Sequence, residues 1–406
     1  MNSARAIADF PKDEYVERWE KVQANMERAN IDAILLGKEE NVTYFSGFRR
    51  VLDYQFVYLI LPRTSPPVLI APLDQRGNVE AMSWIEDVRY YGPRSLGFLS
   101  GSEVGMKVLA EMRLHEKTVG LESSPRVPQQ DVWDALKAKL QSTVRVDSIV
   151  EKLRRVKSPR ELQYLRRACE INTKAITKGL TAINEGMSEQ EYAGIVYRTA
   201  IEEGAVDTPL KGALNLLGGS HRYAMIDTRP TEYTFQKKDI VILDSCIAYR
   251  GYYCDMTRLT CIGQPSKHQR EMYDVALEAQ LAGIDAYQPG QTIGEVCHSV
   301  EQVLQRHNVT QYKLPVFGTS WFGHSVGLEI HERPDIVPVA PDADIVLEPG
   351  MVLTMEPCLC DAPVITNMLE GSKLKGEGVF FVEDNILITK SGHEILTAIP
   401  RELNIV

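Results

Sequence analysis

The chain has 406 residues, of which 44% are hydrophobic and 25% charged, and its formal net charge is −10 at pH 7. One hydrophobic core rarely serves a chain of this length, so we expect two domains. The composition is that of a folded protein and not of a disordered one. The acidic balance argues against a nucleic-acid partner, for which a basic surface would be expected.

The N-terminal stretch MNSARAIADFPKDEYVERWEKV lacks the apolar segment of a secretory signal. No later stretch offers about 18 uninterrupted apolar residues, so no membrane partner is expected. These features predict a cytoplasmic protein. The seven cysteines include no Cys-x-x-Cys pair, which argues against a disulfide framework or a structural zinc knuckle. We interpret them as reduced thiols, mostly buried in the core.

The first part of the chain alternates between helical and strand patterns. Helical periodicity is expected in 14–31, 102–115 and 128–142, whereas short apolar runs predict strands in 32–37, 56–62, 66–72, 117–123 and 144–150. This alternation is typical of an α/β layer that ends near residue 150.

The second part begins with a long helical pattern, in which Ser158 and Pro159 mark a helix start. Helices are also expected in 189–204, 267–287 and 292–307, and strands in 237–249, 251–263, 351–360 and 378–389. Helices that accompany antiparallel hairpins predict an α+β domain with helices on one sheet face. We therefore expect an N-terminal domain at 1–155 and a C-terminal domain at 156–406.

Two aspartates lie in the segment VILDSCIAYRGYYCDMTR, in which a turn around Arg250 and Gly251 joins two strands. In an antiparallel hairpin Asp244 and Asp255 can face each other. Two buried acids repel each other unless they are neutralised, and a divalent cation is one remedy. An ion pair between Asp255 and Arg258 is the alternative.

Further donors follow in three apolar segments. His324 and His331 lie in WFGHSVGLEIHERP, Glu356 ends a strand in LEPGMVLTMEP, and Glu383 is placed inside the strand FFVEDNILIT. Imidazole is a frequent ligand and proton carrier, although a lone histidine is more often structural. Glu383 could equally be an outward-facing residue beside an exposed Asp384. Four acids and one histidine on separate strands suit a pair of divalent ions such as Mn²⁺, Zn²⁺, Co²⁺ or Fe²⁺.

The motifs LDxxxxxxGYxxDxTR, GHxxGLxxHExP, LxPGMVxTxEP and VEDNxLIT, in this order, resemble the creatinase, aminopeptidase P and prolidase family. LRRVKSPRELQYLRRA and ENVTYFSGF extend the resemblance over nearly the whole chain. It implies a smaller creatinase-type N-terminal domain followed by a pita-bread catalytic domain. It also implies that Asp244 chelates one ion, that Asp255 and Glu383 bridge two, and that His324 and Glu356 complete the second.

The resemblance further implies an Xaa-Pro dipeptidase-like hydrolase with two divalent ions, Mn²⁺ first among them. Two ions about 3.5–4 Å apart can share a hydroxide, which would be the nucleophile, and polarise the scissile carbonyl. Glu356 would take a proton, and His331 would hydrogen-bond the carbonyl oxygen as negative charge develops.

The chain also departs from the family pattern. Asp227 stands where the peptidases usually carry a histidine, His221 is six positions too early to replace it, and Phe381 occupies the place of a usual arginine. In related dimers the loop after the N..YFSG segment reaches the neighbouring subunit's pocket. We therefore expect a homodimer, with substrate contacts from Asp227 and His221 and from the loop residues Phe48, Arg49, Arg50 and Tyr54. Solvated surface charge is the alternative for the arginines.

Three functions remain open at this point. The first is hydrolysis of an amide, either in a small Xaa-Pro peptide or in a non-peptide substrate as in the related ectoine hydrolases. The second is a metal-dependent lyase similar to the dimethylsulfoniopropionate lyases, which carry an aspartate where this chain has Cys246. The third is a metal-free binding scaffold, which the retention of all five ligand residues disfavours.

Overall fold

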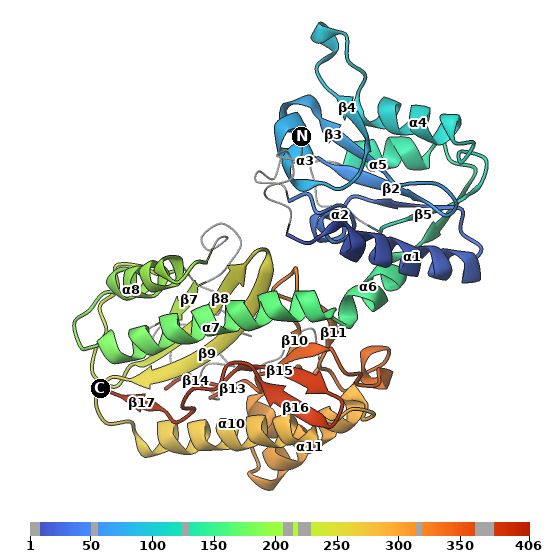
Figure 1. Ribbon diagram of the computed structural model, residues 1–406. Helices are drawn as coiled ribbons and strands as arrows, with labels where there is room; N and C mark the ends of the chain where they lie inside the picture. The colour runs from blue at the N-terminus through green and yellow to red at the C-terminus, as the bar shows by residue number, and fades with distance from the viewer. Residues whose placement is uncertain are drawn as a thin grey trace. The chain divides into compact units, whose positions relative to one another are not determined.

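The structure is a computed structural model that describes residues 9–49, 56–123, 130–205, 229–313, 319–361 and 377–406, together with the backbone of 214–217. The chain divides into two compact units, Met1–Arg154 and Arg155–Val406. Figure 1 shows the first unit in blue to green and the second in green to red. None of the described helices is long and apolar enough to cross a membrane.

The first unit is built on a mixed six-stranded sheet in the order β4-β3-β2-β1-β5-β6. Its strands are β1 (Ala33–Leu36), β2 (Tyr58–Pro62), β3 (Val68–Pro72), β4 (Asp87–Tyr91), β5 (Thr118–Leu121) and β6 (Ser142–Arg145). Strand β1 pairs antiparallel with β2 and parallel with β5. The two central strands β1 and β2 are buried along their whole length, which agrees with their continuous apolar runs.

The helices of this unit are α1 (Lys12–Arg28), α2 (Glu39–Ser46), α3 (Arg76–Met82), α4 (Gly101–Glu111), α5 (Gln130–Lys137) and α6 (Asp147–Arg155). Side chains of α4 and α5 share one apolar core with the sheet, including Val108, Trp133 and Leu136. The strand predicted over 144–150 is wrong in its second half, because α6 begins at Asp147. Val150 and Arg154 are the buried residues of this helix, and their spacing of four is helical.

The helices of the second unit are α7 (Pro159–Ala182), α8 (Glu189–Glu202), α10 (Lys267–Ala286) and α11 (Ile293–Arg306). The predicted start of α7 is confirmed. Ser158 is its N-cap and forms a capping box with Glu161, and Pro159 occupies the first turn.

The strands of the second unit form two main sheets and a short ribbon. The first has the order β17-β9-β8-β7, with β7 (Leu214–Leu217), β8 (Ile240–Tyr249), β9 (Tyr252–Cys261) and β17 (Asn404–Ile405). The second has the order β11-β10-β12-β15-β16, with β10 (His324–Ser325), β11 (Glu332–Asp335), β12 (Val352–Met355), β15 (Asp384–Thr389) and β16 (Gly392–Ile395). The ribbon pairs β13 (Leu359–Cys360) with β14 (Val379–Phe380).

The β8–β9 hairpin buries both of its faces. Side chains on one face, such as Val241 and Leu243, pack in a core with α7 and α8. Those on the other face, such as Ile240 and Ile242, join a core with α10 and α11. The prediction of helices on only one sheet face is therefore wrong for this hairpin, around which Figure 1 draws helices on two sides.

The hairpin turn falls at Arg250 and Gly251, as the sequence predicts. Both residues have positive φ, 51° and 80°, and Tyr249 pairs directly with Tyr252 across the turn. A two-residue turn of this kind matches the twist of the flanking strands and fixes their register. That register decides which side chains share a face of the hairpin.

Candidate metal centre

One face of the β8–β9 hairpin changes along its length from apolar to polar. Side chains alternate between faces along a strand, so Asp244 and Cys246 follow Ile242 on the same face of β8. Across the ladder, Asp244 pairs with Thr257 and Cys246 pairs with Asp255. The two aspartates are thus diagonal neighbours, whereas the sequence allowed them to be directly opposite. They nevertheless share one face, and Asp255 is only 3% exposed.

Glu356 and Glu383 come from breaks between strands of the second sheet. Strand β12 ends at Met355, which pairs with Asp384 at the start of β15. Glu356 comes directly after Met355 and Glu383 directly before Asp384, so both glutamates lie just beyond the last residue pair of these two strands. The prediction that Glu383 lies inside a strand is wrong, since the residue falls between β14 and β15. The break lets the Glu383 backbone N–H donate to the Thr257 carbonyl of β9 at 3.3 Å. Glu383 therefore lies where the second sheet meets the hairpin.

Threonine hydroxyls hold the two glutamate side chains. Thr257 Oγ1 donates to Glu383 Oε2 at 2.9 Å, and Thr354 Oγ1 donates to Glu356 Oε1 at 3.0 Å. Asn385 anchors the Asp255 backbone, because its Oδ1 accepts from the Asp255 N–H at 3.2 Å. These three polar residues orient the acids, and the motif analysis did not single them out. Thr257 could have been found from its spacing of two residues from Asp255 on an alternating strand.

His324 lies fully buried among the acids. Its Nδ1 is 3.1 Å from the Ser325 carbonyl oxygen, which has no proton to give, so Nδ1–H is the donor. In the neutral ring, Nε2 then carries the lone pair. This atom is 3.1 Å from Glu356 Oε1, 3.7 Å from Asp255 Oδ2 and 3.8 Å from Glu383 Oε1.

In this buried site the lone pair of His324 Nε2 faces carboxylate oxygens, so hydrogen-bond acceptors face one another. Glu383 Oε1 is buried and accepts no hydrogen bond from the residues that the structure describes. Burial, and then the neighbouring Asp244 and Glu356, raise the pKa of Asp255 well above its usual value. Burial and then Asp255 do the same to the pKa of Glu383. A site that disfavours its own negative charge in this way is suited to divalent cations, and the donor set of carboxylates and one imidazole fits them.

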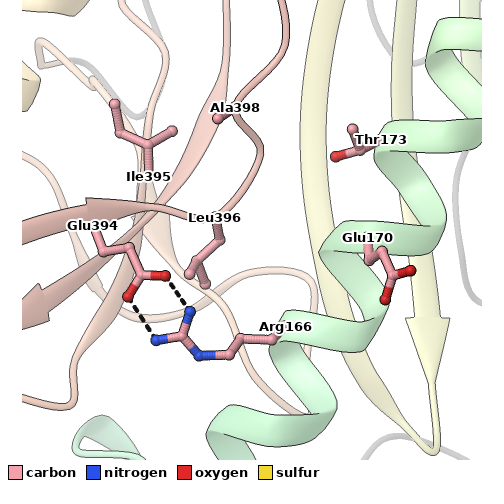
Figure 2. Close-up of a pocket in the computed structure, with 7 residues that line it drawn as sticks. All are labelled: Arg166, Glu170, Thr173, Glu394, Ile395, Leu396 and Ala398. Carbon is pink, nitrogen blue, oxygen red and sulfur yellow. Dashed lines mark hydrogen bonds and ion pairs between the residues drawn. The ribbon is translucent and has the colours of Figure 1, made fainter.

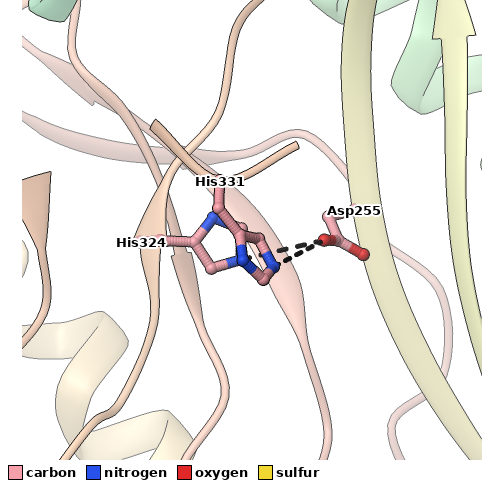
Figure 3. A group of neighbouring side chains, drawn as sticks. All are labelled: Asp255, His324 and His331. Atoms are coloured by element: carbon pink, nitrogen blue, oxygen red, sulfur yellow. Dashed lines mark ion pairs between the residues drawn. The ribbon is translucent and has the colours of Figure 1, made fainter. Parts of the chain in front are cut away.

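His331 lies at the rim of this cluster. Its ring centroid is 4.0 Å from that of His324, and its Nε2 is 4.0 Å from Asp255 Oδ2 (Figure 3). The His331 side chain is 63% exposed, whereas that of His324 is fully buried. Exposure leaves the His331 ring accessible to a small molecule that approaches the acids.

The remaining sequence-predicted substrate residues lie in the first unit or outside the described residues. Phe48 is buried in the first unit, and Arg49 forms an ion pair with Asp9, Nε to Oδ2 at 3.1 Å. Four predicted substrate residues lie outside the described residues, namely Arg50, Tyr54, His221 and Asp227. Phe381, at the place of the usual arginine, is 9% exposed and packs in the core with α10 and α11.

The suggested ion pair between Asp255 and Arg258 is wrong. Arg258 instead binds Asp384, Nη2 to Oδ1 at 2.8 Å, and both side chains are buried. Asp384 was considered as an exposed residue, but its exposed fraction is 0%. It also accepts from Arg401 Nε at 2.6 Å and from Thr397 Oγ1 at 2.7 Å. Asp255 instead contacts Cys246 and His324 in the polar cluster.

A separate hollow lies between α7 and the β16 region (Figure 2). Arg166 reaches across it and binds the Glu394 carboxylate with both terminal nitrogens. Among the predicted site residues that the structure describes, none lines this hollow. The groups of possible metal ligands found in the described part of the chain all lie instead in the carboxylate and imidazole cluster.

A two-sheet domain that gathers acids and an imidazole at its centre has the donor set of a divalent-metal enzyme. Residues 163–390 match metallopeptidase family M24, and residues 18–156 match the creatinase/prolidase N-terminal domain. The first match covers more than half of the chain, so the chain belongs to metallopeptidase family M24. The resemblance seen in the sequence and the predicted pita-bread fold are both confirmed.

Similar proteins cover nearly the whole chain. The Xaa-Pro dipeptidase of Pyrococcus horikoshii is 28% identical over 95% of this chain and 98% of its own. That of Pyrococcus furiosus is 27% identical over 95% and 99%. Among solved structures, the Xaa-Pro dipeptidase from Bacillus anthracis is 26% identical, covers 97% of this chain and 100% of its own, and gives a TM-score of 0.79. Both units of the chain thus have counterparts in the same relatives.

Proposed function

We propose that this protein is an Xaa-Pro dipeptidase that binds two divalent ions through Asp244, Asp255, His324, Glu356 and Glu383. The observation that carries the proposal is the contact of His324 Nε2 with oxygens of three different acids within 3.8 Å. Three groups of possible ligands overlap there, and both Asp255 and His324 belong to two of them. The names of the relatives support the substrate class.

The two carboxylate oxygens of Asp255 support a bridging role. Oδ1 lies beside Cys246 on the Asp244 side of the cluster, and Oδ2 lies toward His324. Asp255 would therefore contribute to both ions, Asp244 to one, and His324 with Glu356 to the other. Glu383 would reach both, since its Oε1 is directed toward His324 and the Thr257 hydroxyl holds its other oxygen.

When bound, the ions would polarise the scissile carbonyl and acidify the attacking water. Glu356 would accept the proton of that water, because its carboxylate is fixed by Thr354 and lies next to the imidazole. His331 would donate a hydrogen bond to the carbonyl oxygen as negative charge develops there. Its exposed position at the rim suits contact with the substrate.

Mn²⁺ is our first choice of metal, with Zn²⁺, Co²⁺ and Fe²⁺ as alternatives, because carboxylate oxygens dominate the donor set. A homodimer stays a prediction from the sequence resemblance, and light scattering on the full chain would test it. The cytoplasmic location also stays a prediction from the sequence.

The test uses chelator-stripped full-length protein to which Mn²⁺, Zn²⁺, Co²⁺ or Fe²⁺ is added singly. Each form is assayed with Xaa-Pro dipeptides, with dipeptides that lack proline, with ectoine and with dimethylsulfoniopropionate. We expect metal-dependent cleavage of Xaa-Pro dipeptides. Failure of every peptide while metal is bound would end the dipeptidase proposal, and turnover of ectoine would then favour the amidohydrolase alternative that the buried Phe381 keeps open.

A further inference from the structure

Cys246 lies among the acids and not in an apolar core. It is directly opposite Asp255 in the hairpin ladder, and its Sγ is 3.0 Å from Asp255 Oδ1. Its exposed fraction is 4%. By contrast, Cys261 on the same face of the hairpin packs among the apolar side chains of α10 and α11. A buried cysteine is usually a small apolar filler, but the surroundings of Cys246 are those of a ligand.

Geometry assigns this thiol to one half of the cluster. Asp244, Cys246 and Asp255 each offer a donor atom, and these three atoms lie within 4.8 Å of one another. Asp244 and Cys246 are two residues apart on β8 and so project to the same side. His324 contacts the other oxygen of Asp255, Oδ2, at 3.7 Å. The thiol and the imidazole thus approach opposite oxygens of one carboxylate.

An independent observation at the same cluster points to a bound cation. Glu383 Oε1 is 3.8 Å from His324 Nε2, and its residue is only 1% exposed. Within the described part of the chain that oxygen accepts no hydrogen bond, although Thr257 holds the other oxygen, Oε2. A buried acceptor without a donor is costly, and it points to a ligand that supplies positive charge.

We propose that the Cys246 sulfur is an additional ligand of the ion held by Asp244 and Asp255. The inference rests on the proposed two-metal function and adds to it a sulfur donor at one ion only. As the sulfur binds the cation, the thiol proton is released to solvent, which balances the exchange. The two ions then have different surroundings, one with oxygen and sulfur and the other with oxygen and imidazole.

This difference has a consequence for metal choice. Thiolate ligands favour Zn²⁺ and other borderline ions, whereas carboxylates suit Mn²⁺. The metal site that includes Cys246 should therefore prefer Zn²⁺ over Mn²⁺ more strongly than the site that includes His324 does. Replacing Cys246 should reduce the preference of this site for Zn²⁺ over Mn²⁺, while the oxygen ligands remain.

The test loads chelator-stripped full-length protein with Co²⁺ and measures both metal content and the near-ultraviolet spectrum. We expect two cobalt ions per chain and a sulfur-to-cobalt charge-transfer band. Cys246→Ser and Cys246→Ala should lose the band and retain bound cobalt. Cys261→Ala is the matched control, since it removes a buried thiol from the apolar end of the same face and should keep the band.

The outcomes separate the two proposals. Wild-type protein that binds two cobalt ions without the band overturns the sulfur ligand and leaves the two-metal function standing. Wild-type protein that binds no cobalt overturns both. A band that persists in both Cys246 variants also overturns the assignment. In competition between Zn²⁺ and Mn²⁺, we expect Cys246→Ser to lower the preference for Zn²⁺ by about tenfold or more, and an unchanged preference would contradict a bound sulfur.

Discussion

Replacing Arg258 by methionine would remove the cation that ties the segment of Asp255 and Thr257 to that of Glu383. Its Nη1 donates to the carbonyl oxygens of Thr257 and Glu383, both at 2.8 Å. Its Nε donates to the Pro400 carbonyl at 2.9 Å, and Nη2 binds Asp384 at 2.8 Å. The side chain is 1% exposed, so water cannot replace these bonds. Arg258→Met therefore leaves the buried carbonyls of Thr257 and Glu383, and the part-buried carbonyl of Pro400, without these donors.

The expected cost follows from these contacts. Breaking a buried ion pair by removing one partner costs about 3–5 kcal/mol. Asp384 keeps Arg401 as a second cation, with Nε at 2.6 Å. The three carbonyls add to the cost, so we expect a loss of about 4 kcal/mol in the free energy of unfolding. Arg401→Met is the matched control, since Arg401 binds the same carboxylate but is 19% exposed. Its loss should cost about 1.5–3 kcal/mol.

Urea unfolding followed by circular dichroism would compare the two variants with the wild type. With a slope of about 3 kcal/mol per molar urea, Arg258→Met should lower the midpoint by roughly 1 M or more. The midpoint of Arg401→Met should fall between those of the wild type and Arg258→Met. If Arg401→Met is as destabilising as Arg258→Met, the reasoning from burial and carbonyl contacts is refuted.

Three further predictions concern the site and the hairpin. Elemental analysis of Glu383→Ala should show the loss of one or both ions, because a bridging carboxylate has no substitute nearby. The control Glu402→Ala changes an exposed residue and should keep both ions. Full metal content in Glu383→Ala would contradict the bridging role. His331→Ala should lower kcat by about 10²-fold or more with unchanged metal content, as expected for a lost donor to the developing oxyanion; an unchanged kcat would exclude that role. Gly251→Ala should lower the unfolding free energy by about 1–2 kcal/mol, because φ is 80° there. Gly194→Ala, in open space on α8, should instead stabilise by about 0.5–1 kcal/mol, and a midpoint shift of the same sign in both variants would count against the turn argument.

Local patterns allowed much of the second unit to be predicted from the sequence. Ser158 and Pro159 mark the start of α7, and the turn residues Arg250 and Gly251 mark the hairpin, because both signals act over a few residues. Alternation along β8 and β9 places the two aspartates in one polar cluster. In the first unit, the second half of the strand predicted over 144–150 is wrong, because a short apolar run fits either period and α6 begins within it.

Contacts between distant segments could not be predicted in this way. The sequence offered Asp255 as a partner of Arg258 three residues away, but the actual partner is Asp384, 126 residues further along the chain. Asn385 likewise reaches back to Asp255 through tertiary packing alone. The offset of Asp244 from Asp255 depended on the hairpin register, which the exact turn residues decide.

The four acids and one imidazole of the cluster come from segments as far apart as β8 and the start of β15, so an unfolded chain cannot assemble them. Ions that bind only the native state shift the folding equilibrium by mass action, by about 2.7 kcal/mol when the free ion is at a hundred times its dissociation constant. Cellular metal supply would then set the lifetime of this protein as well as its turnover rate. A low concentration of the metal ion would first increase the unfolded fraction of the protein and therefore its rate of proteolysis.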